Sequence, residues 1–395
     1  MRSNRTRAGR RRYGTAIAAL LVATTCVVGA TAAGLAGPAY KVAGKWGGNG
    51  AGPGKFSAAR GLAVDKAGNV YAADADNHRV QMFSPTGAFR KQWPLDAGVT
   101  VPDVAVGPGG EVWAATQVNA TVVQLGGGGQ FTTPKSAEGD AVDADGNVYV
   151  STIGDNIRAV VRYDKATSFA EAKRLGGMQD PGDVEVSPDG TIYVGDRRGS
   201  PPSVKRFDAN GKLLKSIRLQ MPATAGAGAQ FGIGVDPDCN LWVTNPGQRN
   251  VMKYSPSGKL LGTATSGDMV GLDVVVGPRG DVYVFDQNGP ASIVRLTEDR
   301  SKPAAAPVGG SVTVANGVAK VKYTLSGVAC PAQVAATASL SGAVNGKASV
   351  KVAAGKSTVL SIPAKGSSGK AQFKIVLKTN GRPTTQVATV NVTAR

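Results

Sequence analysis

Six segments of the chain repeat one pattern of apolar and polar positions. Each segment has an apolar run, a tight turn and a second apolar run that carries an aromatic residue. This pattern predicts two antiparallel strands joined by a hairpin turn. The copies are 36 to 49 residues apart, and a strand-rich repeat of about 40 residues is typical of a propeller blade. The turns begin at Asp65, Gly107, Asp143, Ser187, Asp236 and Gly277.

Each copy continues into further strands, but the last copy is incomplete. The first copy adds runs at 79–83 and 88–93, whereas the sixth has one run at 293–296 and then a Pro-Ala segment. A strand-like segment, 40–46, precedes the first copy without a blade of its own. A closed ring leaves no free sheet edge if this segment completes the sixth blade. We therefore predict an all-β fold, with a six-bladed β-propeller at 33–300 closed by its N-terminal strand.

The first copy resembles an NHL repeat. The resemblance is carried by Gly61–Asp65, Gly68–Tyr71, Asp74, Asn77–Val80 and Trp93. Copies two to six keep the turn and the aromatic residue but lose most of the Asn-His-Arg element, and the resemblance extends over about residues 40–300. It implies a six-bladed propeller. NHL-type propellers bind proteins, nucleic acid or small ligands, and related rings include lactonases and lyases, so the fold leaves the function open.

A second unit follows a linker at 301–310. Seven short β-rich runs lie between 311 and 395, and in 320–325 and 373–378 apolar and polar residues alternate. This alternation over seven runs predicts a small immunoglobulin-like β-sandwich.

The first 32 residues have the pattern of a secretory signal peptide. Six arginines precede an apolar stretch at 15–28 and an Ala-Thr-Ala site at 30–32, which is the order expected of such a peptide. We therefore expect a secreted or cell-envelope protein. The segment could be cleaved or retained as an anchor, and both alternatives stay open. Export by the Sec route or by the twin-arginine route also stays open.

The net charge of +18 is unevenly distributed. Residues 33–302 hold 28 basic and 27 acidic side chains, whereas residues 303–395 hold 11 basic and no acidic ones. A field of one sign attracts polyanions, so we expect the C-terminal unit to bind an anionic envelope polymer or lipid. Solubilisation of a small β-domain is the alternative. The candidate contacts are Lys320, Lys322, Lys374 and Lys378.

Two cysteines follow the signal segment. Cys239 occupies the turn position that is glycine in the other five copies, and Cys330 lies in the C-terminal unit. Replacing a glycine that needs positive φ is unfavourable, so we expect Cys239 to have a role. In an exported protein that role is a disulfide, here with Cys330; two unrelated thiols are the alternative.

Histidine is almost absent, which limits the chemistry. With His78 alone, a zinc site built on several histidines is excluded. Asp103, Asp183 and Asp273 share one aligned position at the start of the inner strands of blades two, four and six, and Asp140 lies one position later in blade three. Their carboxylates could hold a divalent cation at one mouth of the channel. Capping of the loops by backbone N–H bonds is the alternative.

Polar loops between the second and third strands should form a recognition surface on one face. Solvation alone is the alternative. The candidates for ligand contact on this top face are Asp74, Asp76, Asn77, Asp196, Arg197, Arg198, Asn245, Asp286 and Asn288.

These observations favour an exported, monomeric, non-catalytic recognition or scaffold protein without a cofactor. Its propeller would bind a protein, peptide or glycan, and its lysines would associate with the envelope. One alternative is a metal-dependent lactonase- or lyase-like enzyme that uses the channel-mouth carboxylates. A second is an extracellular nucleic-acid binder, for which binding should depend steeply on salt.

Overall fold

The computed structural model describes residues 40–298, apart from 119, 155, 199–200 and 222–229, and the backbone of five strands between 311 and 394. The predicted signal segment at 1–32 and the linker at 301–310 lie outside the described residues. Among those described, no helix has the length and apolar character needed to cross a membrane.

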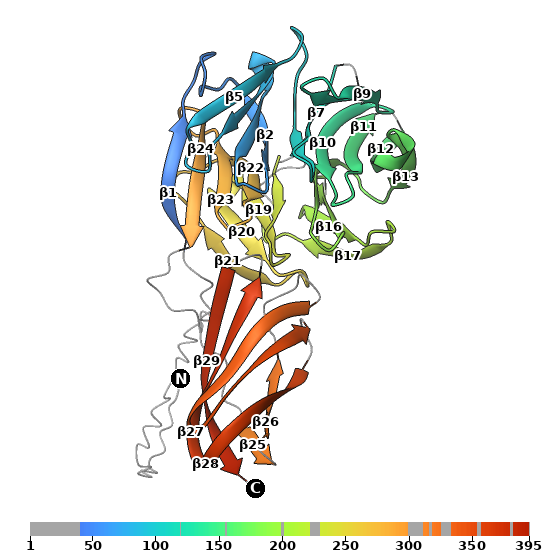
Figure 1. Cartoon of the computed structure of the whole chain (residues 1–395). Coiled ribbons are helices and arrows are strands. Elements are labelled where there is room, and N and C mark those ends of the chain that lie inside the picture. Colours follow the sequence, from blue (N-terminus) through green and yellow to red (C-terminus); the bar gives the residue numbers. More distant parts are fainter. Residues whose placement is uncertain are drawn as a thin grey trace, which may run out of the picture. The chain divides into compact units, whose positions relative to one another are not determined.

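Residues 40–298 form a six-bladed propeller, as predicted. Six four-stranded antiparallel sheets follow one another around a common centre, each with its first strand innermost (Figure 1). Blades one to three hold β2 (Ala59–Val64), β3 (Val70–Asp74), β4 (Arg79–Phe83) and β5 (Phe89–Pro94); β6 (Val104–Val106), β7 (Val112–Thr116), β8 (Thr121–Leu125) and β9 (Gly129–Thr132); and β10 (Ser136–Val142), β11 (Val148–Gly154), β12 (Ile157–Asp164) and β13 (Ala170–Leu175).

The other three blades have the same order. They hold β14 (Pro181–Val186), β15 (Ile192–Asp196), β16 (Ser203–Phe207) and β17 (Leu213–Arg218); β18 (Ile233–Val235), β19 (Leu241–Asn245), β20 (Asn250–Tyr254) and β21 (Leu260–Ala264); and β22 (Gly271–Val276), β23 (Val282–Asp286), β24 (Ser292–Glu298) and β1 (Tyr40–Gly47). Short 3-10 turns lie at η1 (Ala75–Asn77), η2 (Lys165–Thr167) and η3 (Pro246–Gln248).

The N-terminal strand closes the ring. β1 pairs antiparallel with β24, from Tyr40 opposite Glu298 to Gly47 opposite Ser292. The Trp46 ring contacts the rings of Phe83 in blade one and Tyr283 in blade six, at centroid distances of 6.3 and 6.1 Å. The predicted closing strand is therefore confirmed, and it also joins the first and last blades through side-chain packing.

The core lies between neighbouring blades and is supplied mainly by the second strands. Most of these strands are buried along their whole length because sheets cover both of their faces. Three of the outer strands, β5, β13 and β17, are mostly exposed and carry lysine or arginine. Charged side chains on an edge strand hinder pairing with other chains.

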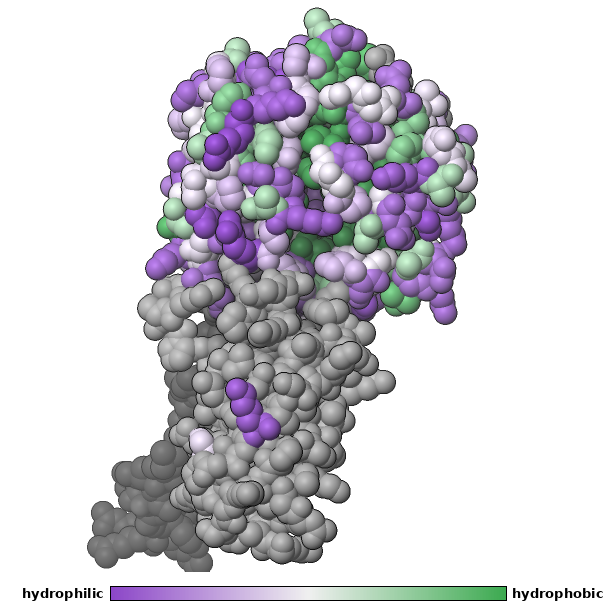
Figure 2. Space-filling view, viewed as in Figure 1, coloured by the Kyte–Doolittle hydropathy of each residue, from purple (hydrophilic) through white to green (hydrophobic). Residues whose placement is uncertain are grey.

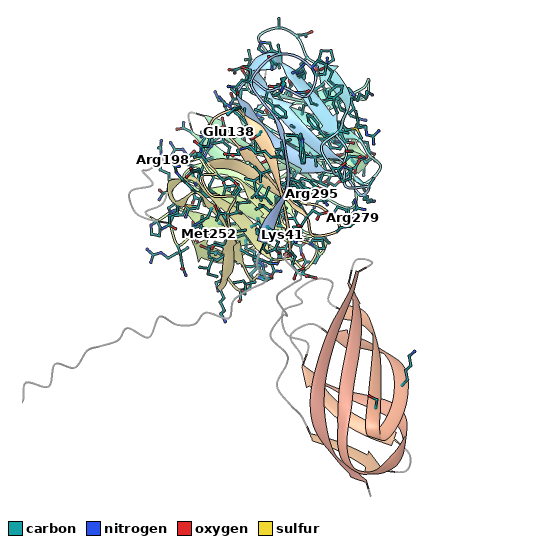
Figure 3. The ribbon with its side chains drawn as sticks, turned by 90° about the vertical axis from the view of Figure 1, so that its left-hand side faces the viewer. Lys41, Glu138, Arg198, Met252, Arg279 and Arg295 are labelled. Carbon is teal, nitrogen blue, oxygen red and sulfur yellow. The ribbon has the colours of Figure 1, made fainter. Side chains whose placement is uncertain are left out.

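We call the end of the propeller where second strands lead into third strands the top face. Glu138 and Arg198 lie toward this end, and Arg279 and Arg295 lie toward the opposite end (Figure 3). Hydrophilic side chains cover much of the propeller surface in view, with smaller hydrophobic patches between them (Figure 2).

The C-terminal backbone is also entirely β. The strands β25 (Ser311–Ala315), β26 (Val318–Thr324), β27 (Gln333–Ala353), β28 (Ser357–Thr379) and β29 (Arg382–Ala394) form one sheet in the order β26-β25-β29-β28-β27, and β26 also pairs with β28. β27 and β28 each span two of the seven predicted runs. The immunoglobulin-like sandwich stays a prediction. The side chains of Lys320, Lys322, Lys374 and Lys378 lie outside the described part of the chain.

Candidate functional site

At the top mouth of the channel, aspartate and glycine alternate from one blade to the next around all six blades. The three predicted aspartates, Asp103, Asp183 and Asp273, lie at the start of the inner strands of blades two, four and six, where the structure brings them together around the channel. At the same register position, blades one, three and five have glycine instead. These glycines are Gly61, Gly139 and Gly232.

Each of the three aspartates joins its own blade to the next one. Oδ2 of Asp103 accepts a hydrogen bond from the Asp140 amide at 3.0 Å. Oδ2 of Asp183 accepts from the Ile233 amide at 2.7 Å, and Oδ2 of Asp273 accepts from the Leu62 amide at 2.7 Å. The carboxylates therefore bridge blades two and three, four and five, and six and one.

The glycines leave room for these carboxylates. A β-carbon on Gly61 would lie 2.6 Å from Cα of Asp103, and one on Gly232 would overlap Asp273. A β-carbon on Gly139 would lie 3.0 Å from Cα of Asp183. Each aspartate thus packs on the glycine of the preceding blade and bonds to the amide of the following blade. The glycine half of this pattern is visible in the aligned repeats, but sequence reasoning missed it.

Burial makes these carboxyl groups hard to ionise. It raises the pKa of Asp183 to about 6, against the lowering effects of the Ile233 amide and of a hydrogen bond with Asp273. Burial, and then the nearby Asp183, raise the pKa of Asp103 and of Asp273 well above the usual range. An ionised carboxylate near others in a desolvated site is unfavourable. The three aspartates therefore hold protons at a pH where exposed aspartates do not.

Backbone amides occupy oxygens of all three aspartates, as the capping alternative expects. In the described part of the chain, no group of three His, Cys, Asp or Glu side chains is arranged to hold a metal ion. The three aspartates face blade junctions and use their oxygens on backbone amides. Asp103, Asp183 and Asp273 therefore join neighbouring blades through these hydrogen bonds, and the cation site stays a prediction.

A cavity of about 590 Å³ opens on the top face between blades five, six and one. We call it the top-face cavity. A recess of about 60 Å³ at the channel mouth, the mouth recess, shares Arg60, Gln230 and Leu272 with it and includes the three aspartates. The top-face cavity is lined by apolar groups such as Phe285 and by neutral amides such as Gln287.

Arg60 is the charged side chain that borders both hollows. It is partly buried, and it has no hydrogen bond or ion pair to another residue in the structure as described. Ala58 at the cavity rim has a left-handed backbone, with φ of 50°. Sequence reasoning missed Arg60 because it lies on an inner strand rather than in a loop. A register shift between Ala59 and Leu62 places it at the mouth, and bulges often re-aim side chains in this way.

Four of the predicted top-face residues are buried and hold the loops together. Asp74 bonds to Nε of Arg79 at 2.8 Å and to the Ser57 amide at 2.7 Å. Asp196 accepts from the Gln179 and Asp180 amides, both at 3.0 Å. Asn245 caps η3, and Asp286 accepts from the Val270 amide and from Lys45. Of the four, Asn245 belongs to the lining of the top-face cavity.

The other five predicted residues are more accessible. Asp76 and Arg198 are exposed. Asn77 donates to the Gly50 carbonyl and Asn288 to the Asp268 carbonyl, so both hold loops. Arg197 borders the mouth recess, where it pairs with Asp180 at 3.2 Å and with Glu138 at 3.6 Å.

Two remaining predictions concern single residues. Cys239 has φ of 59°, the left-handed geometry expected of a turn position that is glycine in the other blades, and its side chain is buried. Cys330 lies outside the described residues, so the disulfide stays a prediction. His78 follows η1 with φ of 50°, and its Nδ1 lies 2.9 Å from the carbonyl oxygen of Val99, which lies between β5 of blade one and β6 of blade two. This contact ties blade one to the segment that leads into blade two.

Comparison with known proteins supports an NHL repeat in blade one. The NHL repeat family matches residues 56–83. A gluconolactonase from Zymomonas mobilis subsp. mobilis is 23% identical over 237 residues, which cover 47% of this chain and 66% of that protein, just under two thirds of its length. Among solved structures, a streptogramin B lyase has 13% identity and a TM-score of 0.49 over 66% of this chain and 98% of its own. A virginiamycin B lyase from Staphylococcus aureus has 13% identity and a TM-score of 0.47 over 65% and 99%.

Proposed function

We propose that the chain is an exported recognition protein that binds a peptide, protein or glycan in the top-face cavity without transforming it. The lining of this cavity carries the proposal. Its described residues include amides, apolar groups and Arg60, but no Asp, Glu, His, Cys, Ser or Thr. General acid–base and nucleophilic catalysis depend on such side chains. Largely apolar hollows with a few polar groups are typical of binding sites.

Arrays of peptides and glycans test this proposal. The wild-type chain is compared with Arg60→Ala and Gln287→Ala, which change the cavity, and with Arg198→Ala, an exposed arginine toward the same face. We expect at least one ligand whose binding falls tenfold or more in the cavity variants and is kept in Arg198→Ala. Chemical change of that ligand by the wild-type protein, or equal binding by all four chains, contradicts the proposal.

The C-terminal unit is proposed to bind an anionic envelope polymer or lipid through its lysines. The support is its composition of 11 basic and no acidic residues. The test is co-sedimentation with anionic vesicles, anionic wall polymer or nucleic acid at 50 and 300 mM salt. Wild type is compared with a variant that has glutamine at Lys320, Lys322, Lys374 and Lys378. Salt-dependent envelope binding that this variant loses is expected, whereas preference for nucleic acid favours the alternative partner.

A Cys239–Cys330 disulfide is part of the same proposal. Its support is the buried position of Cys239 in a left-handed turn and the expected export of the chain. Closing a long loop stabilises a protein by up to about 4–5 kcal/mol in the loop-entropy model. Peptide mapping without reductant should recover the cross-linked pair from the exported protein. Two free thiols in the exported protein would contradict the proposed disulfide.

A second candidate function is hydrolysis of a lactone. Two observations favour it: the similarity to a gluconolactonase and the pKa of about 6 for Asp183 beside the mouth recess, which suits an acid–base group near neutral pH. Assays of lactone opening with and without added Ca²⁺, on wild type and Asp183→Asn, test this candidate. Turnover lost in Asp183→Asn would move the assignment to an enzyme.

A further inference from the structure

Next to the three mouth aspartates, the channel holds two further acids, Asp140 and Glu185. A cavity of about 110 Å³, which we call the channel cavity, lies along the inner strands of the propeller. Its described lining includes Asp103, Asp140, Asp183 and Glu185 and is otherwise made of Leu, Ala and Val residues. No lysine, arginine or histidine is among these lining residues, so nothing in the wall balances four carboxyl groups.

Two of these acids, Asp140 and Glu185, occupy positions at which the other five blades have no acidic residue. Where blade three has Asp140, the other blades have Leu or Ile or Val, including Leu62 and Ile233 at the same register. Where blade four has Glu185, the others have Ala, Gly or Val, including Ala141. The propeller closes without an acid at either position in its other blades. Both departures come from adjacent blades and line the same cavity.

Asp140 differs from the ring aspartates in having no partner. The residue is 4% exposed, and neither carboxylate oxygen has a hydrogen bond. Burial, and then the charge of Asp183, raise the pKa of Asp140 well above the usual range. Burial of an unpaired carboxyl group is unfavourable. The Asp140 carboxyl group lines the channel cavity and is available to accept hydrogen bonds from a ligand there.

The shape and chemistry of the hollow select the kind of cation. The described acids do not form a group that could hold a metal ion. An ammonium group has three N–H donors and reaches carboxylates through hydrogen bonds. Since one water occupies about 30 Å³ of liquid, the channel cavity has room for an ammonium group on a short alkyl stem, and its aliphatic wall suits that stem.

We propose that the channel cavity binds the ammonium end of a linear primary amine, with Asp140 and Glu185 as its acceptors and the inner-strand side chains around its alkyl stem. This site is separate from the top-face cavity, so each proposal can fail without the other.

Calorimetry and thermal unfolding of the full chain with n-butylamine at pH 8 test the proposal. The neutral n-butanol serves as the isostere, and Na⁺ and Ca²⁺ serve as competing cations. We expect one amine per chain, a higher Tm with amine, and binding of n-butanol at least tenfold weaker. The heat of amine binding at pH 6 should also depend on the buffer, because the acids release protons as the amine enters.

Variants identify the acceptors. Asp140→Asn and Glu185→Ala should weaken n-butylamine at least tenfold, whereas the exposed Asp145→Asn should stay within twofold of wild type. Asp140→Leu restores the residue type of blade one, so it should fold, melt higher than wild type without amine, and no longer respond to amine. Each of four results would overturn the proposal. These are unchanged n-butylamine binding in Asp140→Asn, equal effects of n-butanol and n-butylamine, displacement of the amine by micromolar Ca²⁺, and no effect of the amine on Tm or heat at up to 20 mM.

Discussion

At the scale of single residues, Ala58 has a backbone conformation that alanine disfavours. Its φ of 50° lies in the left-handed region, at the rim of the top-face cavity. For a residue with a β-carbon this region is unfavourable by about 1–2 kcal/mol, whereas glycine adopts it readily.

We therefore expect Ala58→Gly to stabilise the propeller by about 0.5–1 kcal/mol, since relief of strain exceeds the greater entropy of the unfolded chain. Denaturant unfolding measures the change. The exposed Ala67, whose φ is not positive, is the control, and Ala67→Gly should not stabilise. A destabilised Ala58→Gly variant would show that the conformation is not strained.

Asp183 predicts how stability depends on pH. Burial raises its pKa in the folded state to about 6, above the unfolded value of about 3.9. The protonated carboxyl therefore favours the folded state fully below the unfolded pKa, and this contribution is lost as pH rises through 6. Asparagine cannot ionise. Asp183→Asn should gain stability relative to wild type between pH 4.5 and 8, by about 2 kcal/mol.

Unfolding free energies of both chains at pH 4.5 and 8 measure this difference. Asp76→Asn, at an exposed top-face position, is the control and should show no such trend. An equal offset between Asp183→Asn and wild type at both pH values would mean that Asp183 ionises normally.

At the scale of elements, the junctions between blades depend on small residues. An alanine at Gly61 would place its β-carbon 2.6 Å from Cα of Asp103, whereas one at Gly176 would meet nothing within 4 Å. Overpacking in a close-packed interior is unfavourable by about 1–3 kcal/mol. Gly61→Ala should destabilise the propeller by an amount at the upper end of this range, whereas Gly176→Ala should leave its stability nearly unchanged. Thermal or denaturant unfolding measures both changes. Similar effects of both changes would argue against a tight junction.

The closing strand gives a second prediction at this scale. β1 supplies the outer strand of blade six and inserts Trp46 between blades six and one. A chain that begins at Tyr40 should unfold cooperatively, whereas one that begins at Gly48 should lose this transition, because blade six would expose an edge and the core would lack Trp46. Circular dichroism on heating distinguishes them. A native-like transition in the shorter chain would show that the ring closes without β1.

At the scale of the whole molecule, the propeller is three pairs of blades rather than six equal ones. Blades one, three and five have glycine at the channel mouth and an aspartate at the opposite turn, where Asp65, Asp143 and Asp236 each accept from the amide four residues later and from an asparagine side chain. Blades two, four and six have the acid at the mouth and Gly or Ser at the turn. The mouth aspartates of one set of blades and the turn aspartates of the other set thus lie at opposite ends of the channel, which reduces the repulsion between these two sets.

Much of this architecture could be predicted from the sequence because it is encoded locally. Alternating apolar positions and turn glycines determine strands, and their period determined the number of blades and the unpaired segment at 40–46. The same alignment identified Asp103, Asp183 and Asp273 as equivalent, because register within a repeat depends on residues close together in the chain.

Only the tertiary structure decided what these residues contact. The amide that each ring aspartate accepts from belongs to another blade, up to 211 residues away for Asp273 and Leu62. The top-face cavity, the exposure of Arg60 to it and the absence of a partner for Asp140 likewise depend on which surfaces meet when the ring closes. Periodicity specifies each blade, whereas ring closure sets the distances between blades, and those distances determine where a ligand can bind.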